Sequence, residues 1–224
     1  MLSAICLFVR KDLHFAMGPG GIFIQALVVG ILPIFLMGLA ASELAAPSPR
    51  LAASAFWLAS LISCILTAPA LYENERPCLA ALLILPAGSR IIWLCKTISV
   101  FIVLALAQLF YLAATGVFFN LGAASLSFGA AIGWALCNAG LCAISAMFAP
   151  LAKTGRERYL AAILLVPACL PLLMAGINLA SLAFISENGA GVWRTLLFTA
   201  ATDMVFISLA LLLSPFLFRA AANE

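Results

Sequence analysis

Long apolar runs alternate with short polar stretches along this chain. A membrane-spanning helix needs about 20 mostly apolar residues, and six runs reach that length. They cover residues 21–41, 51–72, 92–119, 126–150, 160–183 and 195–218. Continuous apolar runs exclude a transmembrane β-barrel, whose strands show short alternating segments. The pattern therefore predicts an all-α polytopic membrane protein. The stretches between the runs are too short to fold separately, so we expect residues 1–224 to form one transmembrane domain.

Composition agrees with the pattern, because 66% of the residues are hydrophobic and only 8% are charged. The net charge of +3 gives no sign of a nucleic-acid partner, and we expect none. The distribution of the charges is more informative. If the N-terminus is inside, nine of the 11 Lys and Arg residues fall on that side, and only Arg50 and Arg194 fall on the other. The positive-inside rule then predicts that both termini are cytoplasmic.

Residues 1–20 predict a helix that lies in the cytoplasmic interface. Its apolar positions share one helical face: Leu2, Ile5, Cys6, Val9 and Leu13. Arg10, Lys11 and His14 fall elsewhere, which suits a basic side among lipid headgroups. The charges follow the apolar residues and no small-residue cleavage site appears, so we do not interpret this segment as a cleavable signal.

The connection between the second and third spans carries an unusual mixture of residues. Glu73, Glu75 and Arg76 require water, whereas the run between Pro77 and Pro86 is apolar but too short to span. Pro77 suits the first turn of a helix, and Pro86 would end it. A short cytoplasmic helix explains this pattern, and a loop lying along the membrane explains it equally well.

Few ionisable groups lie inside the spans. Lys96 is one or two turns inside the third span, from where its ammonium can extend towards the cytoplasmic headgroups. Tyr72, at the end of the second span, is interpreted as an interfacial aromatic residue. Asp203 is the clearest intramembrane ionisable group, but it stands nearly alone, so we favour a packing or interfacial role over ion coupling. His14, the sole histidine, has no neighbour with which to complete a metal or haem site.

No sequence motif supports catalysis by this chain. The phosphate-binding loop Gly-x-x-x-x-Gly-Lys-Ser/Thr is absent, so ATP does not bind by that route. A single histidine on a surface helix cannot complete a Ser–His–Asp triad. Seven cysteines lack the Cys-x-x-Cys spacing and are interpreted as packing residues. We therefore expect no enzyme and no cofactor or metal bound by motif. The architecture fits a permease that receives force from a partner through a cytoplasmic loop.

Several segments resemble the haem exporter protein B family (CcmB), the permease-like subunit of the cytochrome c maturation system. They are residues 56–61 (Phe-Trp-Leu-Ala-Ser-Leu), 72–75 (Tyr-Glu-Asn-Glu), 79–86 (Leu-Ala-Ala-Leu-Leu-Ile-Leu-Pro) followed by Lys96, and 163–173, which end in Pro-x-x-x-Pro-Leu-Leu. Length and span number also match, so the similarity covers essentially the whole chain. The sequence departs from the family at Pro77, where Gly is usual, and at Ala80, where an acidic residue is common.

The resemblance implies an ABC-2-type permease in the bacterial inner membrane. An ATPase subunit (CcmA) would dock on the cytoplasmic face, and a haem-handling subunit (CcmC) with a small helper (CcmD) would lie beside this chain. Haem would be the transported or handled ligand, ATP would act only through the partner, and two copies of the chain would form a homodimer. The complex would use ATP to release the haem-loaded chaperone (CcmE) on the outer side.

This resemblance gives a mechanical hypothesis in which the ATPase pushes on residues 73–86. The docking residues would be Glu73, Glu75, Arg76, Leu79, Leu82 and Leu83. Pro167 and Pro171 would let the fifth span bend as the bundle rearranges. Three alternatives remain open: a permease of another ABC-2-type exporter, a stand-alone ion-coupled transporter that uses Asp203, and a structural scaffold for haem-handling subunits.

Overall fold

The structure is a computed structural model that describes residues 2–18, 21–42, 48–73, 88–121, 128–150, 155–185 and 190–222. Its helices are α1 (Leu2–Met17), α2 (Ile22–Ser42), α3 (Pro49–Glu73), α5 (Gly88–Phe118), α6 (Phe128–Phe148), α7 (Gly155–Ile185) and α8 (Ala190–Ala222). The described ranges contain no strand, so the all-α prediction is confirmed.

Six of these helices are long and apolar enough to cross a membrane, which confirms the predicted number of spans. The spans are Ile22–Ala41, Pro49–Tyr72, Ser89–Phe118, Gly129–Phe148, Ile163–Phe184 and Gly191–Phe216. The last two helices extend beyond the predicted apolar runs, to 155–185 and 190–222. A count of apolar residues finds only the hydrocarbon part of a helix, whereas Arg156 and Arg194 continue the same helices at their polar ends.

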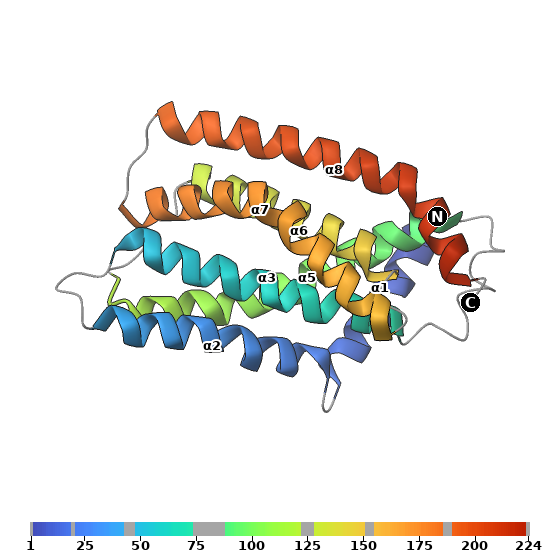
Figure 1. The fold of residues 1–224 in the computed structure, drawn as a ribbon, viewed down its shortest axis with the longest axis horizontal. Helices are drawn as coiled ribbons and strands as arrows, with labels where there is room; N and C mark the ends of the chain where they lie inside the picture. Colours follow the sequence, from blue (N-terminus) through green and yellow to red (C-terminus); the bar gives the residue numbers. More distant parts are fainter. Residues whose placement is uncertain are drawn as a thin grey trace.

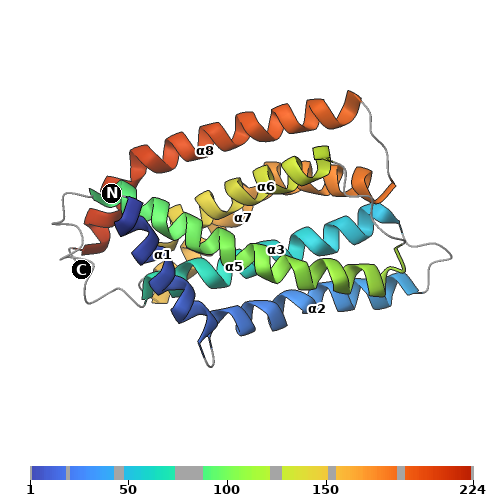
Figure 2. The ribbon, with the colours of Figure 1, turned by 180° about the vertical axis from the view of Figure 1, so that it is seen from behind.

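The six spans run side by side, and α1 lies across one end of the bundle (Figures 1 and 2). The chain termini lie at this end, which we call the termini end, and the opposite end is called the far end. In packing, α2 contacts mainly α3 and α5, while α6 contacts α5, α7 and α8. Because α8 packs chiefly on α6, it forms the edge of the bundle opposite α2.

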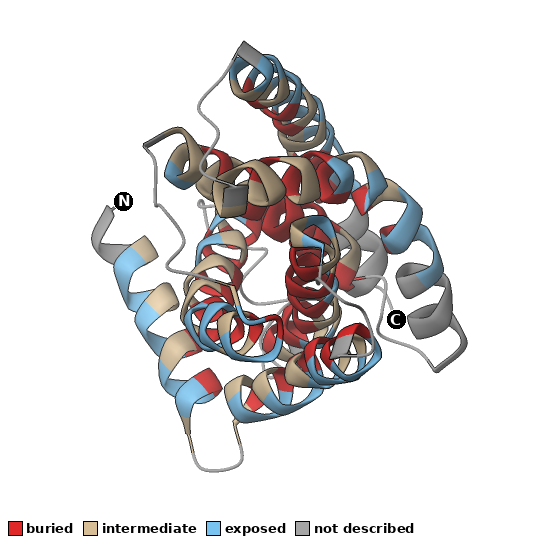
Figure 3. Cartoon of the chain, turned by 90° about the vertical axis from the view of Figure 1, so that its left-hand side faces the viewer, coloured by how far each residue is buried: buried red, intermediate tan, exposed pale blue. Residues whose placement is uncertain are grey.

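Buried residues gather where the helices face one another, and exposed residues cover the outside (Figure 3). Large side chains such as Trp57, Tyr111 and Leu141 fill the interior. The outside is also apolar, with Leu197 and Phe216 each about 70% exposed. A soluble protein does not expose so many large apolar side chains, so this surface fits a lipid environment.

At the far end, α5 closes with a left-handed residue. Asn120 has a φ of 48°, a conformation that asparagine tolerates better than most residues. The amide of Leu121 donates to the carbonyl of Gly116, and that of Phe119 donates to Thr115. These bonds satisfy carbonyl groups in the last turn of α5 and fix where the span ends.

Candidate functional site at the termini end

The two helix ends that bracket the predicted ATPase-docking segment, the last residue of α3 and the first of α5, lie at the termini end (Figure 1). Glu75, Arg76, Leu79, Leu82 and Leu83 fall outside the described residues. Of Glu73 the structure gives only the backbone, as the last residue of α3. The site can therefore be built from the two helix ends that bracket the segment, at Glu73 and Gly88.

A buried lysine lies close to both helix ends. Lys96 is only 1% exposed, and its Nζ donates to Oδ1 of Asp12 at 2.8 Å. It also donates to the carbonyl oxygen of Leu71, in the last turn of α3, at 3.0 Å. The prediction that this ammonium reaches the headgroups is wrong. The Lys96 ammonium is buried because the Asp12 carboxylate and the Leu71 carbonyl accept the hydrogen bonds that water would otherwise accept.

Asp12 brings α1 into the site. Its side chain is 2% exposed, and its second oxygen, Oδ2, accepts a hydrogen bond from the Ser99 hydroxyl at 3.0 Å. Among the residues of α1 whose burial is described, Asp12 and Ala16 are buried, Cys6 is exposed, and the other members of the predicted apolar face are half-buried: Ile5, Val9 and Leu13. The face that α1 turns to the bundle therefore overlaps the predicted apolar face but also includes the charge of Asp12. The Asp12 carboxylate is buried on this face because two residues of α5, Lys96 and Ser99, donate hydrogen bonds to it.

Two aromatic residues extend the site to α6. Tyr72, predicted to be interfacial, is 4% exposed, and its ring centroid lies 5.5 Å from Lys96 Nζ. The Tyr72 hydroxyl donates to the carbonyl of Ala146 at 3.1 Å. The indole nitrogen of Trp93 donates to the carbonyl of Ala143 at 3.3 Å. The prediction for Tyr72 is corrected because its hydroxyl has a partner inside the bundle and needs no contact with water.

We call Asp12, Tyr72, Trp93, Lys96 and Ser99 the anchor cluster. Its hydrogen bonds connect α1, α3, α5 and α6 around the two ends that hold the predicted docking segment. A buried ion pair is tolerated only when the remaining donors and acceptors are also satisfied. That condition gives the pair a fixed geometry, so the anchor cluster can act as a stiff joint between these helices.

A second polar contact lies deeper in the bundle. The side-chain amides of Gln108 on α5 and Asn138 on α6 exchange two hydrogen bonds, of 2.8 and 2.7 Å. Gln108 Nε2 also donates to the hydroxyl of Ser60 on α3 at 2.8 Å. The sequence showed these residues only as isolated neutral polar groups. Together they fix the register of α3, α5 and α6 in a region that is otherwise apolar.

Asp203, the intramembrane carboxylate flagged from the sequence, is buried between α8 and α6. It is 4% exposed, and neither carboxylate oxygen has a hydrogen-bond partner among the described residues. Gly140 on α6 lies directly opposite, and a Cβ at that position would collide with Asp203 Oδ1. The close approach of α6 and α8 at this level therefore depends on the missing side chain of Gly140.

The other predicted residues lie apart from the anchor cluster. Pro167 and Pro171 are both inside α7, which is assigned as one helix from Gly155 to Ile185. Their role in bending stays a prediction. His14 is exposed on α1. Among the described residues, no group of three His, Cys, Asp or Glu side chains is placed to hold a metal ion.

Comparison with known proteins identifies one family. A family profile described as CcmB protein matches residues 3–223, which is essentially the whole chain. No curated protein and no solved structure matches the chain.

Proposed function

The chain belongs to the CcmB protein family, and we propose that it transmits the force of ATP hydrolysis in a partner subunit across the membrane. The family places it as a permease subunit of an ABC-type haem-export system in cytochrome c maturation. It is thus a multi-pass inner-membrane transport protein and not a catalytic enzyme. The full-length family match is the observation that carries this conclusion.

The proposed route of force begins at residues 73–86. The ATPase subunit CcmA docks there through Glu73, Glu75 and Arg76, with the apolar side chains of Leu79, Leu82 and Leu83 in its groove. The anchor cluster supports this route, because Lys96 joins the last turn of α3 to α5 and to α1. A push on the segment then moves three helix ends together and does not merely deform a loop.

The family and the distribution of charges support the rest of the proposed assembly. Both termini are cytoplasmic, as the positive-inside rule predicts. Two copies of the chain form a homodimer beside the haem-handling subunit CcmC and its helper CcmD. Haem is the cargo, and the power stroke releases the haem-loaded chaperone CcmE on the outer side. Pro167 and Pro171 let α7 bend during the stroke.

The test is a charge reversal in the docking segment. Glu73→Lys with Glu75→Lys should abolish co-purification of the ATPase and stop cytochrome c maturation, while membrane insertion stays normal. Glu187→Lys is the matched control, because this glutamate lies in the connection between α7 and α8, on the opposite side in the proposed topology. The docking proposal is wrong if the double variant still binds the ATPase and matures cytochromes.

A second candidate function rests on Asp203. A buried carboxylate that has no hydrogen-bond partner among the residues that the structure describes is costly in a membrane and is a candidate ion-coupling site. In that case the chain would transport its substrate with an ion gradient and no ATPase. Asp203→Asn distinguishes the two, because it would abolish ion-coupled transport. Under the proposed ATP-driven function, the same variant leaves maturation intact.

A further inference from the structure

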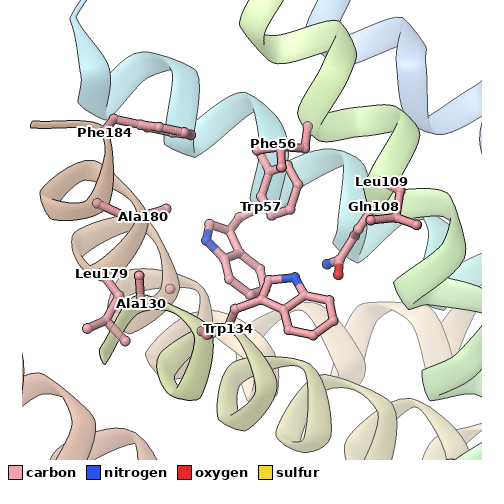
Figure 4. A pocket seen from close by; sticks show the side chains of 13 residues that line it. Phe56, Trp57, Gln108, Leu109, Ala130, Trp134, Leu179, Ala180 and Phe184 are labelled. Carbon is pink, nitrogen blue, oxygen red and sulfur yellow. The ribbon is translucent and has the colours of Figure 1, made fainter. Parts of the chain in front are cut away.

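A cavity of about 270 Å³ lies in the far half of the bundle, between α3, α5, α6 and α7. Four aromatic side chains and one amide form much of its wall: Phe56, Trp57, Trp134, Phe184 and Gln108. In Figure 4, side chains from α3, α5 and α6 converge on this space, with α7 on its other side. None of these residues belongs to the anchor cluster, so the cavity is separate from the candidate coupling site.

The wall offers almost nothing to a polar occupant. Gln108 gives its amide to Asn138 and Ser60. Trp57 is 2% exposed, and its indole nitrogen has no hydrogen-bond partner among the described residues. A buried water needs two to four polar partners, and the only side-chain donors left in the described wall are the indole N–H groups of Trp57 and Trp134, too few for the several waters that about 270 Å³ would hold. Water therefore does not fill the cavity, and a ligand with charged groups has no partner there.

The surroundings of the cavity indicate its occupant. Leu109 and Leu112, on the α5 side of the wall, are 63% and 37% exposed, and both belong to a span. The cavity is thus continuous with the lipid-facing surface of α5. We propose that it binds one acyl chain of a membrane lipid. In the proposed topology this lipid belongs to the outer leaflet, but the binding site itself does not depend on that orientation.

Size supports an acyl chain over a larger apolar ligand. An apolar cavity of about 150 Å³ stays dry and holds one benzene molecule. The present cavity is less than twice that volume, so it accommodates a length of hydrocarbon chain. It is too small to enclose a porphyrin, which consists of four linked five-membered rings. The cavity is therefore a lipid site beside the transport function, and not an enclosed haem pocket.

Two buried tryptophans provide a matched test. Trp57 lines the cavity, whereas Trp93 lies outside it, and each is 2% exposed. Both stand within about two turns of one end of their helix, so their depths in the two halves of the membrane are comparable. Variants that retain only Trp57 or only Trp93 are placed in vesicles of phosphatidylcholine with brominated chains, which quench tryptophan at close range. We expect a larger loss of fluorescence for Trp57, because bromine enters the cavity. Equal quenching of the two would overturn the proposal.

A second pair of variants keeps all four tryptophans. Ala180→Leu fills part of the cavity. Ala113→Leu adds the same bulk at an exposed position of α5 that does not line it. Ala180→Leu should reduce quenching by brominated chains, and Ala113→Leu should leave it unchanged. If both variants are quenched like the native chain, no acyl chain occupies the cavity.

Discussion

Removal of the buried ammonium of Lys96 tests the anchor cluster most directly. Lys96→Met keeps most of the side-chain volume but removes the cationic partner of the Asp12 carboxylate, which is 2% exposed and 2.8 Å from Lys96 Nζ. Breaking a buried ion pair in this way costs about 3–5 kcal/mol. Since domains are stable by only about 5–15 kcal/mol, we expect a large loss of stability, with α1 detached from α5.

The double variant Asp12→Leu with Lys96→Met separates the interaction energy of the ion pair from the energy that each residue contributes through its other contacts. It removes both charges together, and replacing a buried ion pair by apolar residues is often neutral or stabilising. We therefore expect the double variant to lie within about 1 kcal/mol of the native chain. Asp12→Leu alone should be costly, because the buried Lys96 ammonium loses its carboxylate partner. The coupling energy from the complete cycle should be at least about 2 kcal/mol.

The assay is unfolding of the purified chain in mixed micelles with increasing denaturing detergent, followed by circular dichroism. Arg90→Met is the control, because Arg90 lies on the same helix near the same end but is exposed. Its cost should stay within about 0.5 kcal/mol. If Lys96→Met costs no more than Arg90→Met, the ion pair does not hold α1 in place. A double variant as unstable as the worse single variant would contradict the pairing itself.

Three further predictions concern the spans. Gly140→Ala should cost about 1–3 kcal/mol in the same unfolding assay, because the added Cβ meets Asp203 Oδ1 and Leu172 Cδ1. Adding Asp203→Ala should recover the part of the loss that the carboxylate causes, and no recovery would contradict that contact. Asn138→Leu leaves the Gln108 amide without its reciprocal partner and should cost about 1–3 kcal/mol, whereas Asn138→Gln should cost less. Pro171→Ala should leave the unfolding midpoint unchanged or higher but slow cytochrome c maturation, and normal maturation would argue against bending of α7.

The sequence predicts the spans well, because the length of an apolar run is a local property. It does not predict the anchor cluster, because Lys96 and Asp12 are 84 residues apart. Asp12 lies beside basic residues in a short helix and resembles any solvated polar position. One signal was available: a lysine inside a span needs a counter-ion. The chain has only eight Asp and Glu residues, and Asp12 is the one that precedes all the spans.

The arrangement of the helices, unlike their number, depends on the few polar residues within them. Lipid chains are as apolar as leucine, so apolar contacts alone give no strong preference for one helix rotation over another in a membrane. In this bundle the charged pair of Lys96 and Asp12 lies at the termini end, and the neutral pair of Gln108 and Asn138 lies deeper. A charge becomes more costly towards the middle of the bilayer, so the order of these two pairs follows that cost, whereas the buried carboxylate of Asp203 departs from it. Because a buried charge costs less near the membrane surface, the anchor cluster lies at the end of the bundle next to the proposed docking segment, where the ATPase would exert its force.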